Sequence, residues 1–375
     1  MKLRSLIFVS LVFTSFCSSA QNQITKIDSI LSGGIYRTYR LYIPKSYDVT
    51  KSSSLVIDLH GYTSNAEQEQ YYSNFKAIAD TANFLVAYPN GTRLGGTGDQ
   101  FWNAGLSSTL PNDVHFISEL IDKIKAAYSI DLNSVYACGM SNGGFMSHTL
   151  ACSLNNKIAA IASVTGSMFV SQYGTCVPNR VVPVMQIHGT ADNTVPYTGN
   201  SSMVPIDTLM HFWVKHNKCN STPDIDSVPD INKADSCTAI HYVYKNGLQG
   251  STCELYKIVG GGHSWPGSPF KIAVTNQDFN ASEKIWLFFR KYKLNNMLNV
   301  PQTNGEIAVT MYPNPCVDQL YIEAQQLKSI SILDITGKVV IESIQPEIDV
   351  RDLSQGIYSV IITTKNGQVV KRLIK

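Results

Sequence analysis

The sequence predicts an α/β domain, in which a mostly parallel sheet carries helices on both faces, followed by a small all-β domain. Nearly continuous apolar runs such as residues 55–59 and 84–88, typical of strands buried on both faces, alternate with helical segments up to residue 292. After residue 305 the helical segments stop and short β-branched runs follow one another. A hydrophobic content of 44% against 15% charged residues suits a packed chain of 375 residues.

The elements of the α/β domain follow from the spacing of apolar residues. In the segment 113–128, for example, apolar residues recur at intervals of three and four, which indicates a helix buried along one face. Strands are expected at residues 35–43, 55–59, 84–88, 134–137, 158–164, 182–187 and 255–259. Helices are expected at residues 67–80, 113–128, 145–151, 206–216 and 282–292.

The C-terminal part of the chain has a different pattern. Residues 295–305 are polar and contain Pro301 and Gly305, so they are predicted to be a linker between an α/β domain at 21–294 and an all-β domain at 306–375. Short strands are expected at residues 320–322, 330–333, 339–341 and 357–362. Thr336-Gly337 and Asn366-Gly367 are typical of hairpin turns.

The N-terminus is predicted to be a signal peptide spanning residues 1–20. Lys2 and Arg4 form its positive region, residues 6–13 its apolar region, and Ser18-Ser19-Ala20 the small residues before cleavage. The apolar run is too short to span a bilayer, and no later segment reads as transmembrane. The protein is therefore expected to be secreted, to the extracellular space or the cell surface.

Charge and ligand spacing exclude several classes of partner. The net charge is +2 and no basic run with interleaved aromatic residues occurs, so nucleic acid is not expected as a partner. The histidines lack the spacing of metal ligands, and Gly143-Gly144 is not followed by the Lys-Ser/Thr pair of a phosphate-binding loop. No metal and no cofactor are expected.

The cysteines of an exported chain are expected to form some disulfides. Proximity along the chain predicts that Cys152 pairs with Cys176. It also predicts that Cys219 pairs with either Cys237 or Cys253, a choice that the sequence leaves open. A further cysteine, Cys138, lies in a predicted buried strand, where it can serve as a small apolar residue.

The stretch Cys138-Gly139-Met140-Ser141-Asn142-Gly143-Gly144 has the pattern G-x-S-x-G between a predicted strand and a predicted helix. A serine on such a sharp turn leaves no room for side chains two residues away, and Gly139 and Gly143 have none. The start of the next helix directs its N–H groups and positive dipole toward the serine. Ser141 is therefore the candidate nucleophile, against the alternative of a glycine-rich turn that contains a serine by chance.

A serine nucleophile needs a base and an orienting carboxylate, which follow it in this order along the chain as Asp or Glu, then His. Asp192 lies in a loop directly after the strand 182–187, and His263 lies in a glycine-rich loop after the strand ending at Val259. The alternative for Asp192 is ordinary turn chemistry. His188 follows the right strand but precedes Asp192, which reverses the order. Asp192 and His263 are the predicted partners of Ser141.

Two backbone N–H groups are predicted to bind the oxyanion of the reaction intermediate. The first belongs to Asn142, directly after the nucleophile. The second belongs to Tyr62, in the segment His60-Gly61-Tyr62 that follows the strand 55–59. The alternative for this segment is a plain turn at the end of a strand.

With these four motifs in order, residues 25–292 resemble the polyhydroxybutyrate depolymerase and feruloyl esterase branch of the α/β-hydrolases, close to carbohydrate esterase family 1. The resemblance implies Ser141 as nucleophile, Asp192 as acid, His263 as base, and Asn142 and Tyr62 as oxyanion donors. It extends to two further segments, 88–91 and 101–103. Two tryptophans are then candidates to line the acyl pocket, or simply to pack in the core: Trp102 and Trp265.

The C-terminal domain resembles the sorting domain of the type IX secretion system. The matching segments are Tyr312-Pro313-Asn314-Pro315 and residues 334–338, 353–358 and 371–375. This resemblance implies export across the outer membrane by the type IX machinery, with the tail removed or used for surface attachment. The alternative is a small β-sandwich that binds polysaccharide.

The sequence therefore predicts a secreted serine esterase that acts through an acyl-enzyme, most simply on feruloyl or acetyl esters of plant polysaccharide. A polyester of the polyhydroxybutyrate type is the alternative substrate. A non-catalytic surface protein that binds polysaccharide is the alternative of another class. A peptidase is a weaker alternative, because it would usually carry an additional propeller or lid domain.

Overall fold

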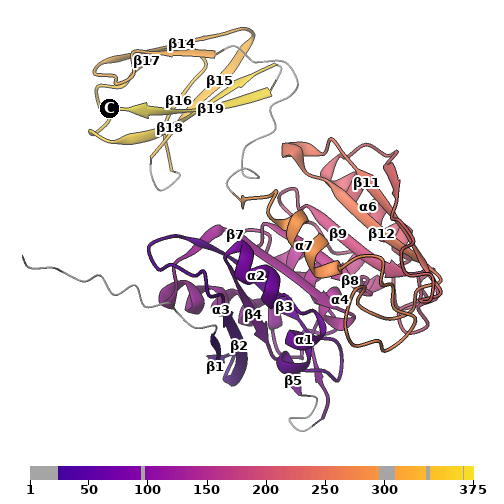
Figure 1. Ribbon diagram of the computed structural model, residues 1–375. Coiled ribbons are helices and arrows are strands. Elements are labelled where there is room, and N and C mark those ends of the chain that lie inside the picture. Colours follow the sequence, from indigo (N-terminus) through magenta and orange to yellow (C-terminus); the bar gives the residue numbers. More distant parts are fainter. Residues whose placement is uncertain (1–23, 94–97, 295–308, 335–337, 366) are drawn as a thin grey trace, which may run out of the picture.

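A computed structural model describes residues 24–93, 98–294, 309–334, 338–365 and 367–375. The predicted signal peptide 1–20, the linker 295–305 and the turn Thr336-Gly337 lie outside the described residues. Figure 1 shows an α/β part, which begins at Ile24 and ends at Leu294, and an all-β part, which begins at Val309. Each part has its own buried core.

A ten-stranded mixed sheet forms the centre of the α/β part. Its six central strands, from β4 to β12 in the order below, run parallel, and antiparallel strands close both edges. The order across the sheet is β1 (Ile24–Ser32), β2 (Ile35–Ile43), β4 (Phe84–Pro89), β3 (Ser53–Leu59), β7 (Ile130–Met140), β8 (Ala160–Val164), β9 (Val184–Gly189), β12 (Cys253–Val259), β11 (Thr238–Tyr244) and β10 (Asp224–Ser227). The predicted mostly parallel sheet is confirmed.

Helices cover both faces of this sheet (Figure 1), as predicted, and each face has a separate apolar cluster. One face carries α1 (Ala66–Tyr72), α2 (Lys76–Ala82) and α7 (Ala281–Phe289). The other carries α3 (Asp113–Ala127), α4 (Asn142–Ser153) and α6 (Ile206–Asn217). Smaller elements are α5 (Val170–Tyr173), the 3-10 turn Leu248–Gly250, and the ribbon β5 (Thr92–Arg93) with β6 (Gln100–Phe101).

Asparagine side chains fix where several of these helices begin. Asn65, Asn112 and Asn280 each accept hydrogen bonds from N–H groups of the first turn of α1, α3 and α7. The helix predicted at 67–80 is in fact two helices, α1 and α2. The chain breaks at Asn74, whose φ of 54° is left-handed and cannot continue a helix.

The all-β part consists of two small antiparallel sheets. One sheet contains β13 (Val309–Tyr312), β14 (Gln319–Ala324) and β17 (Glu347–Asp349). The other contains β16 (Val339–Ser343), β15 (Leu327–Leu333), β18 (Ile357–Thr364) and β19 (Gly367–Ile374). Alternating residues such as Leu320, Ile322, Ile330 and Ile332 point into the shared core, which confirms the predicted small all-β fold.

The cysteines confirm one predicted disulfide and contradict the other. Cys152, in the last turn of α4, is bonded to Cys176, with Cα atoms 5.2 Å apart. Cys219, Cys237 and Cys253 are free thiols. Cys219 lies beside Cys253, which opposes Tyr244 at one end of the β11–β12 pair. Cys237 precedes β11 at the other end of this pair, so the register excludes a link between Cys219 and Cys237.

Cys219 and Cys253 do lie side by side, as two thiols in hydrogen-bond contact. This contact lowers the pKa of Cys219, while burial raises the pKa of Cys253 well above its usual range. Cys138 is buried in β7 beside Asp58, to which its Sγ donates over 3.5 Å. Burial raises the pKa of this thiol too, which suits a small core residue.

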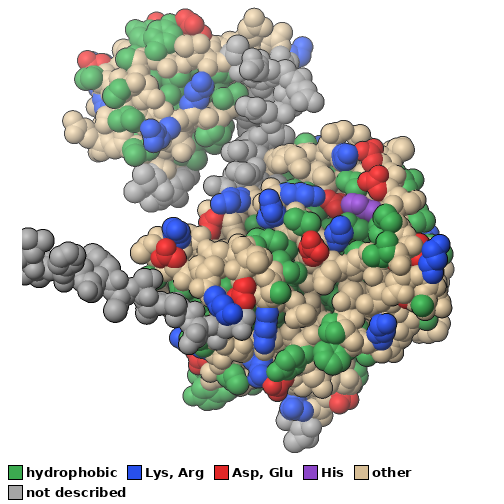
Figure 2. Space-filling model, viewed as in Figure 1, with side chains coloured by type: hydrophobic (Ala, Val, Ile, Leu, Met, Phe, Trp, Pro, Cys, Tyr) green, Lys and Arg blue, Asp and Glu red, His purple; other side chains and the backbone are tan. Residues whose placement is uncertain are grey.

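The described residues show how charge is distributed on one face of the molecule and whether any helix could cross a membrane. On the face shown in Figure 2, basic and acidic side chains are interspersed among hydrophobic and neutral ones. Within the described ranges, no helix combines the length and the apolar character needed to cross a bilayer.

Candidate active site

Four loops of the α/β part meet at one edge of the sheet, because β3, β7, β9 and β12 run parallel and end there. Each loop follows its strand directly: His60 to Tyr62 after β3, Ser141 after β7, Asp192 after β9 and His263 after β12. The structure therefore brings together the segments from which all the predicted site residues except Trp102 come.

Ser141 occupies a strained turn between β7 and α4. Its φ of 53° is in the left-handed region, and its N–H donates to the carbonyl of Val164 over 2.8 Å. The two flanking glycines are required by contact. A Cβ on Gly139 would lie 2.4 Å from the carbonyl oxygen of Leu59, and one on Gly143 would lie 1.9 Å from the same oxygen. The turn can therefore form only with glycine at both positions.

Asp192 and His263 are in direct contact. Asp192 Oδ2 lies 2.8 Å from His263 Nδ1, and the aspartate is almost completely buried. Its other oxygen, Oδ1, accepts the N–H groups of Thr194 and Val195 over 2.9 and 2.8 Å. Because three groups hold the carboxylate, it can fix the orientation of the imidazole and stabilise a positive charge on it.

The loops that carry these two residues are packed backbone against backbone. Ala191 N–H donates to the carbonyl of Gly261, and Gly260 N–H donates to Thr190 Oγ1, both over 2.9 Å. A Cβ on Gly189 would lie 2.2 Å from the oxygen of Gly261, so this approach requires glycine. The contact between Asp192 and His263 is therefore held by the close packing of the two loops.

His188 is completely buried beside Asp192. Its Nε2 is 2.8 Å from the carbonyl of Val195, which can only accept, so Nε2 carries the hydrogen. The same Nε2 lies 3.5 Å from Asp192 Oδ2. The Nε2–H group of His188 is thus used by Val195, and the ring packs beside the carboxylate without a hydrogen bond to it.

A buried chain of hydrogen bonds fixes this protonation state of His188. Trp213 Nε1–H donates to His148 Nδ1, His148 Nε2–H donates to Gln186 Oε1, and Gln186 Nε2–H donates to His188 Nδ1, each over 3.1 Å. The indole can only donate, so every later role in the chain is determined. Burial lowers the pKa values of both histidines, that of His148 to about 4. The chain thus consists of neutral groups.

This neutrality gives a pH-dependent prediction for the variant His148→Gln. Between about pH 6.5 and 4 the unfolded chain binds a proton at His148 that the folded chain does not. The unfolding free energy therefore decreases as the pH is lowered, by about 2 kcal/mol at pH 5. Glutamine does not titrate, so the variant should lose about 2 kcal/mol less than the wild type between pH 7.5 and 5. Urea unfolding followed by tryptophan fluorescence measures this difference. Equal losses in both proteins would contradict it.

The predicted oxyanion donors lie next to Ser141. A Cβ built on Gly61 would be 3.5 Å from the Cβ of Ser141, which places the Gly61-Tyr62 turn against the serine. The N–H groups of Tyr62 and Asn142 make no hydrogen bond to any residue that the structure describes. They are therefore available to a ligand. His60 steadies the turn, since Nδ1–H donates to Gly61 O over 2.7 Å while Nε2 accepts from Gly91 N–H.

Asn142 also has a structural role that the sequence did not predict. Its side-chain oxygen accepts the N–H of Trp102 over 2.6 Å, and its side-chain nitrogen donates to the Trp102 carbonyl over 3.1 Å. The indole of Trp102 in turn donates to the carbonyl of His60 over 3.0 Å. These bonds connect the two loops that carry the candidate oxyanion donors.

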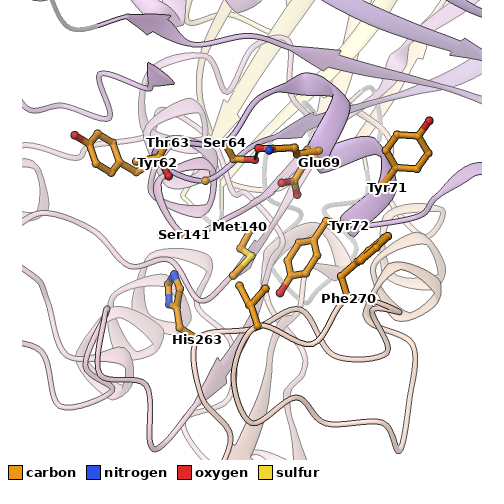
Figure 3. Close-up of a pocket in the computed structure, with 13 residues that line it drawn as sticks. Tyr62, Thr63, Ser64, Glu69, Tyr71, Tyr72, Met140, Ser141, His263 and Phe270 are labelled. Atoms are coloured by element: carbon orange, nitrogen blue, oxygen red, sulfur yellow. Dashed lines mark hydrogen bonds between the residues drawn. The ribbon is translucent and has the colours of Figure 1, made fainter. Parts of the chain in front are cut away.

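A cavity of about 470 Å³ opens beside Ser141 and His263 (Figure 3). Most of its wall comes from the Gly61 turn, which the sequence had singled out, and from α1 and the residues Phe270 and Ile272, which it had not. The lining residues are Gly61, Tyr62, Thr63, Ser64, Gln68, Glu69, Tyr71, Tyr72, Met140, Ser141, His263, Phe270 and Ile272. The part of this wall that comes from α1 includes a pair of neighbouring tyrosines in the sequence, Tyr71-Tyr72.

Trp102 and Trp265, proposed from sequence as pocket residues, do not line this cavity. Both are fully buried, and both indole N–H groups are used inside the core, by the carbonyl of His60 and by Ser282 Oγ over 3.0 Å each. They correspond to the packing alternative. Among the described residues, no cluster of three or more His, Cys, Asp or Glu side chains is arranged to hold a metal ion.

Comparison with known families agrees with both parts of the chain. Residues 103–224 match the phospholipase/carboxylesterase family, and residues 310–375 match the secretion system C-terminal sorting domain. The α/β part therefore has the α/β-hydrolase fold, and the all-β part is similar to a sorting domain, which supports export. The resemblance inferred from the motifs is confirmed.

Three of the relatives that the chain matches are named as esterases or depolymerases. The chain is 32% identical over 164 residues to a bifunctional acetylxylan esterase/xylanase of Neocallimastix patriciarum, covering 44% of this chain and 22% of that protein. It is 30% identical over 232 residues to feruloyl esterase B of Piromyces equi, covering 59% and 41%. It is 24% identical over 298 residues to poly(3-hydroxyalkanoate) depolymerase C of Paucimonas lemoignei, covering 71% and 67%. The chain thus spans less than half of the first two relatives.

Among solved structures, a candidate dipeptidyl aminopeptidase IV from Bacteroides ovatus superposes with a TM-score of 0.50. The match covers 72% of this chain and 36% of that one, at 11% identity. At this identity the likeness concerns the fold alone.

Proposed function

We propose that this α/β-hydrolase with a C-terminal sorting domain is an exported serine esterase whose catalytic residues are Ser141, Asp192 and His263. The observation that carries the proposal is the 2.8 Å contact between the buried Asp192 and His263, at a cavity that His263 shares with Ser141. A nucleophile, a base and a buried carboxylate that orients the base are the three parts that acyl transfer by serine requires.

The reaction follows from the chemistry of these groups. Ser141 Oγ attacks the ester carbonyl while His263 Nε2 takes its proton, and Asp192 stabilises the imidazolium that forms. The free N–H groups of Tyr62 and Asn142 bind the developing oxyanion. His263 then protonates the leaving alcohol, which departs and leaves an acyl-enzyme on Ser141. Water, activated by the same histidine, attacks the acyl-enzyme and releases the acid.

The substrate we propose is a feruloyl or acetyl ester on plant polysaccharide. Two relatives are named for feruloyl and acetylxylan ester cleavage, and the cavity of about 470 Å³ has a wall rich in aromatic side chains. A polyester of the polyhydroxybutyrate type is the second candidate, favoured by the match to a poly(3-hydroxyalkanoate) depolymerase. The third is binding of polysaccharide without catalysis.

We also propose the route of export. The predicted signal peptide at residues 1–20 would direct the chain out of the cytoplasm, and the domain at 306–375 would engage the type IX secretion machinery. The α/β domain at 21–294 would then act outside the cell, either free or attached to the cell surface.

The test uses the full chain with p-nitrophenyl acetate, methyl ferulate and a poly(3-hydroxybutyrate) film, together with a fluorophosphonate probe. We expect hydrolysis of at least one ester, and a covalent adduct that peptide mass spectrometry locates on Ser141. If the folded chain hydrolyses none of the three and Ser141 remains unlabelled, the esterase proposal is wrong. Retention on insoluble xylan would then support the binding alternative.

A further inference from the structure

The segment 100–103 contacts the loop of each candidate oxyanion donor. On one side it meets the turn that carries Tyr62. The carbonyl of its first residue accepts the N–H of Thr63 over 3.0 Å. The indole of Trp102 donates to the carbonyl of His60 over the same distance. Because Tyr62 lies between these two points of attachment, the position of its N–H depends on this segment.

On its other side, the same segment holds the side chain of Asn142. The amide of Asn142 accepts the backbone N–H of Trp102 over 2.6 Å and donates to the Trp102 carbonyl over 3.1 Å. Asn142 is the first residue of α4, and its own backbone N–H is the second candidate oxyanion donor. A side chain fixed at two points leaves its residue little freedom to move. The segment thus holds the second donor as well as the first.

A buried ion pair fixes the segment itself. Asp113 Oδ2 accepts the N–H of Asn103, and Asp113 Oδ1 accepts a hydrogen bond from Arg37 Nη2, each over 2.6 Å. The carboxylate is fully enclosed, and the guanidinium is 3% exposed and lies 4.0 Å from the ring centroid of Phe116. The desolvation of both charges offsets much of their attraction, so stability alone does not explain this pair. Its hydrogen bond to Asn103 anchors the residue next to Trp102.

We propose that the segment 100–103 sets the separation of the two candidate oxyanion donors. Asp113, Trp102 and the side chain of Asn142 are thereby positioning residues for the reaction. This inference rests on the proposed esterase function and adds residues that act through the two donor N–H groups. In the intermediate, the charged oxygen must lie within about 3 Å of both groups. Donors held at the right spacing need no rearrangement as charge develops, so a shift of either loop weakens binding of the transition state more than binding of the ester.

The test uses the full chain and two variants that keep both donor N–H groups. Asn142→Ala removes the two side-chain hydrogen bonds, and Trp102→Phe removes the indole donor but keeps an aromatic ring in its place. For each variant we expect kcat for p-nitrophenyl acetate to fall by about tenfold to a hundredfold, with KM within about threefold of the wild-type value. Because both changes loosen the same connection, the double variant should lose much less than the product of the two single losses.

Phenylboronic acid reports on the two donors without turnover. Ser141 Oγ adds to the boron while the proton of its hydroxyl passes to His263, and an oxygen of the tetrahedral boronate takes the place of the oxyanion. The inhibition constant should rise in each variant by about the factor by which kcat falls. A loss of stability alone would leave the boronate affinity of the folded protein unchanged.

Asn217→Ala is the matched control. Asn217 is fully buried, and its side chain likewise makes two hydrogen bonds to the backbone of one residue, Val182, over 3.0 and 2.7 Å. The variant should lose stability in urea but keep the wild-type kcat and boronate affinity. If Asn142→Ala or Trp102→Phe folds and keeps kcat within about twofold, or loses kcat without losing boronate affinity, the positioning role is wrong and the esterase stands. If the wild type cleaves no ester at all, both proposals are wrong.

Discussion

Replacing Ser141 with alanine is expected to reduce kcat for p-nitrophenyl acetate by about a millionfold, to a residual rate that depends on the oxyanion donors and on binding. Alanine also carries one Cβ, so it places the same demand on the left-handed backbone at this position, where φ is 53°. The variant should therefore fold normally. Steady-state kinetics on the full chain, with protein unfolding curves for both forms, measure the two expectations.

The matched control is Ser153→Ala, at the exposed C-terminal end of the same helix α4. It should keep wild-type kinetics and still react with a fluorophosphonate probe, whereas Ser141→Ala should not react. If Ser141→Ala retains more than about one tenth of the wild-type rate, another residue is the nucleophile, and the roles proposed for Asp192 and His263 must be abandoned with it.

The contact between Asp192 and His263 could be anticipated because its signals are local. Each residue lies in a turn directly after an apolar strand, and neighbouring parallel strands end at the same edge of a sheet. The two residues are 71 positions apart and still meet at 2.8 Å. The need for the glycines around Ser141 could also be predicted, since any side chain there would meet the backbone of Leu59.

The wall of the cavity could not be predicted, because it depends on where tertiary packing sends each aromatic side chain. A tryptophan can bury its whole ring when a core acceptor takes its N–H, and Trp102 and Trp265 both find such acceptors. Glu69 and Tyr72 face the cavity from a short helix that ends before Asn74, where one longer helix was expected. Asparagine tolerates the left-handed conformation, so Asn74 was the sequence signal for a break between the two helices.

The edge strands were missed for a related reason. No strand was predicted at residues 24–32, yet β1 (Ile24–Ser32) pairs with β2 along its whole length. An antiparallel edge strand is only partly covered, so its apolar and polar residues are mixed and form no continuous run. The same applies to β10, whose four residues are all exposed.

Replacing Asp192 with asparagine is expected to reduce kcat by about 10⁴-fold near neutral pH with little change in fold. In the native protein one carboxylate oxygen accepts two backbone N–H groups, and the other faces the ring nitrogens of His263 and His188. An amide has only one acceptor oxygen. Whichever way it is turned, its NH₂ group faces either the backbone N–H donors of Thr194 and Val195 or the Nδ1 atom of His263.

The orientation that keeps the backbone hydrogen bonds directs the NH₂ group at His263 Nδ1. The imidazole then carries its hydrogen on Nε2, where it cannot take the proton of Ser141, and this wrong tautomer is the reason for the large loss. The control is Asp207→Asn, which should keep wild-type kinetics. Asp207 is an exposed residue of α6 that accepts a hydrogen bond from the hydroxyl of Tyr197. NMR of the imidazole nitrogens would report the tautomer directly. If Asp192→Asn keeps both the native tautomer and the wild-type kcat, Asp192 does not orient the base, and the buried contact is structural.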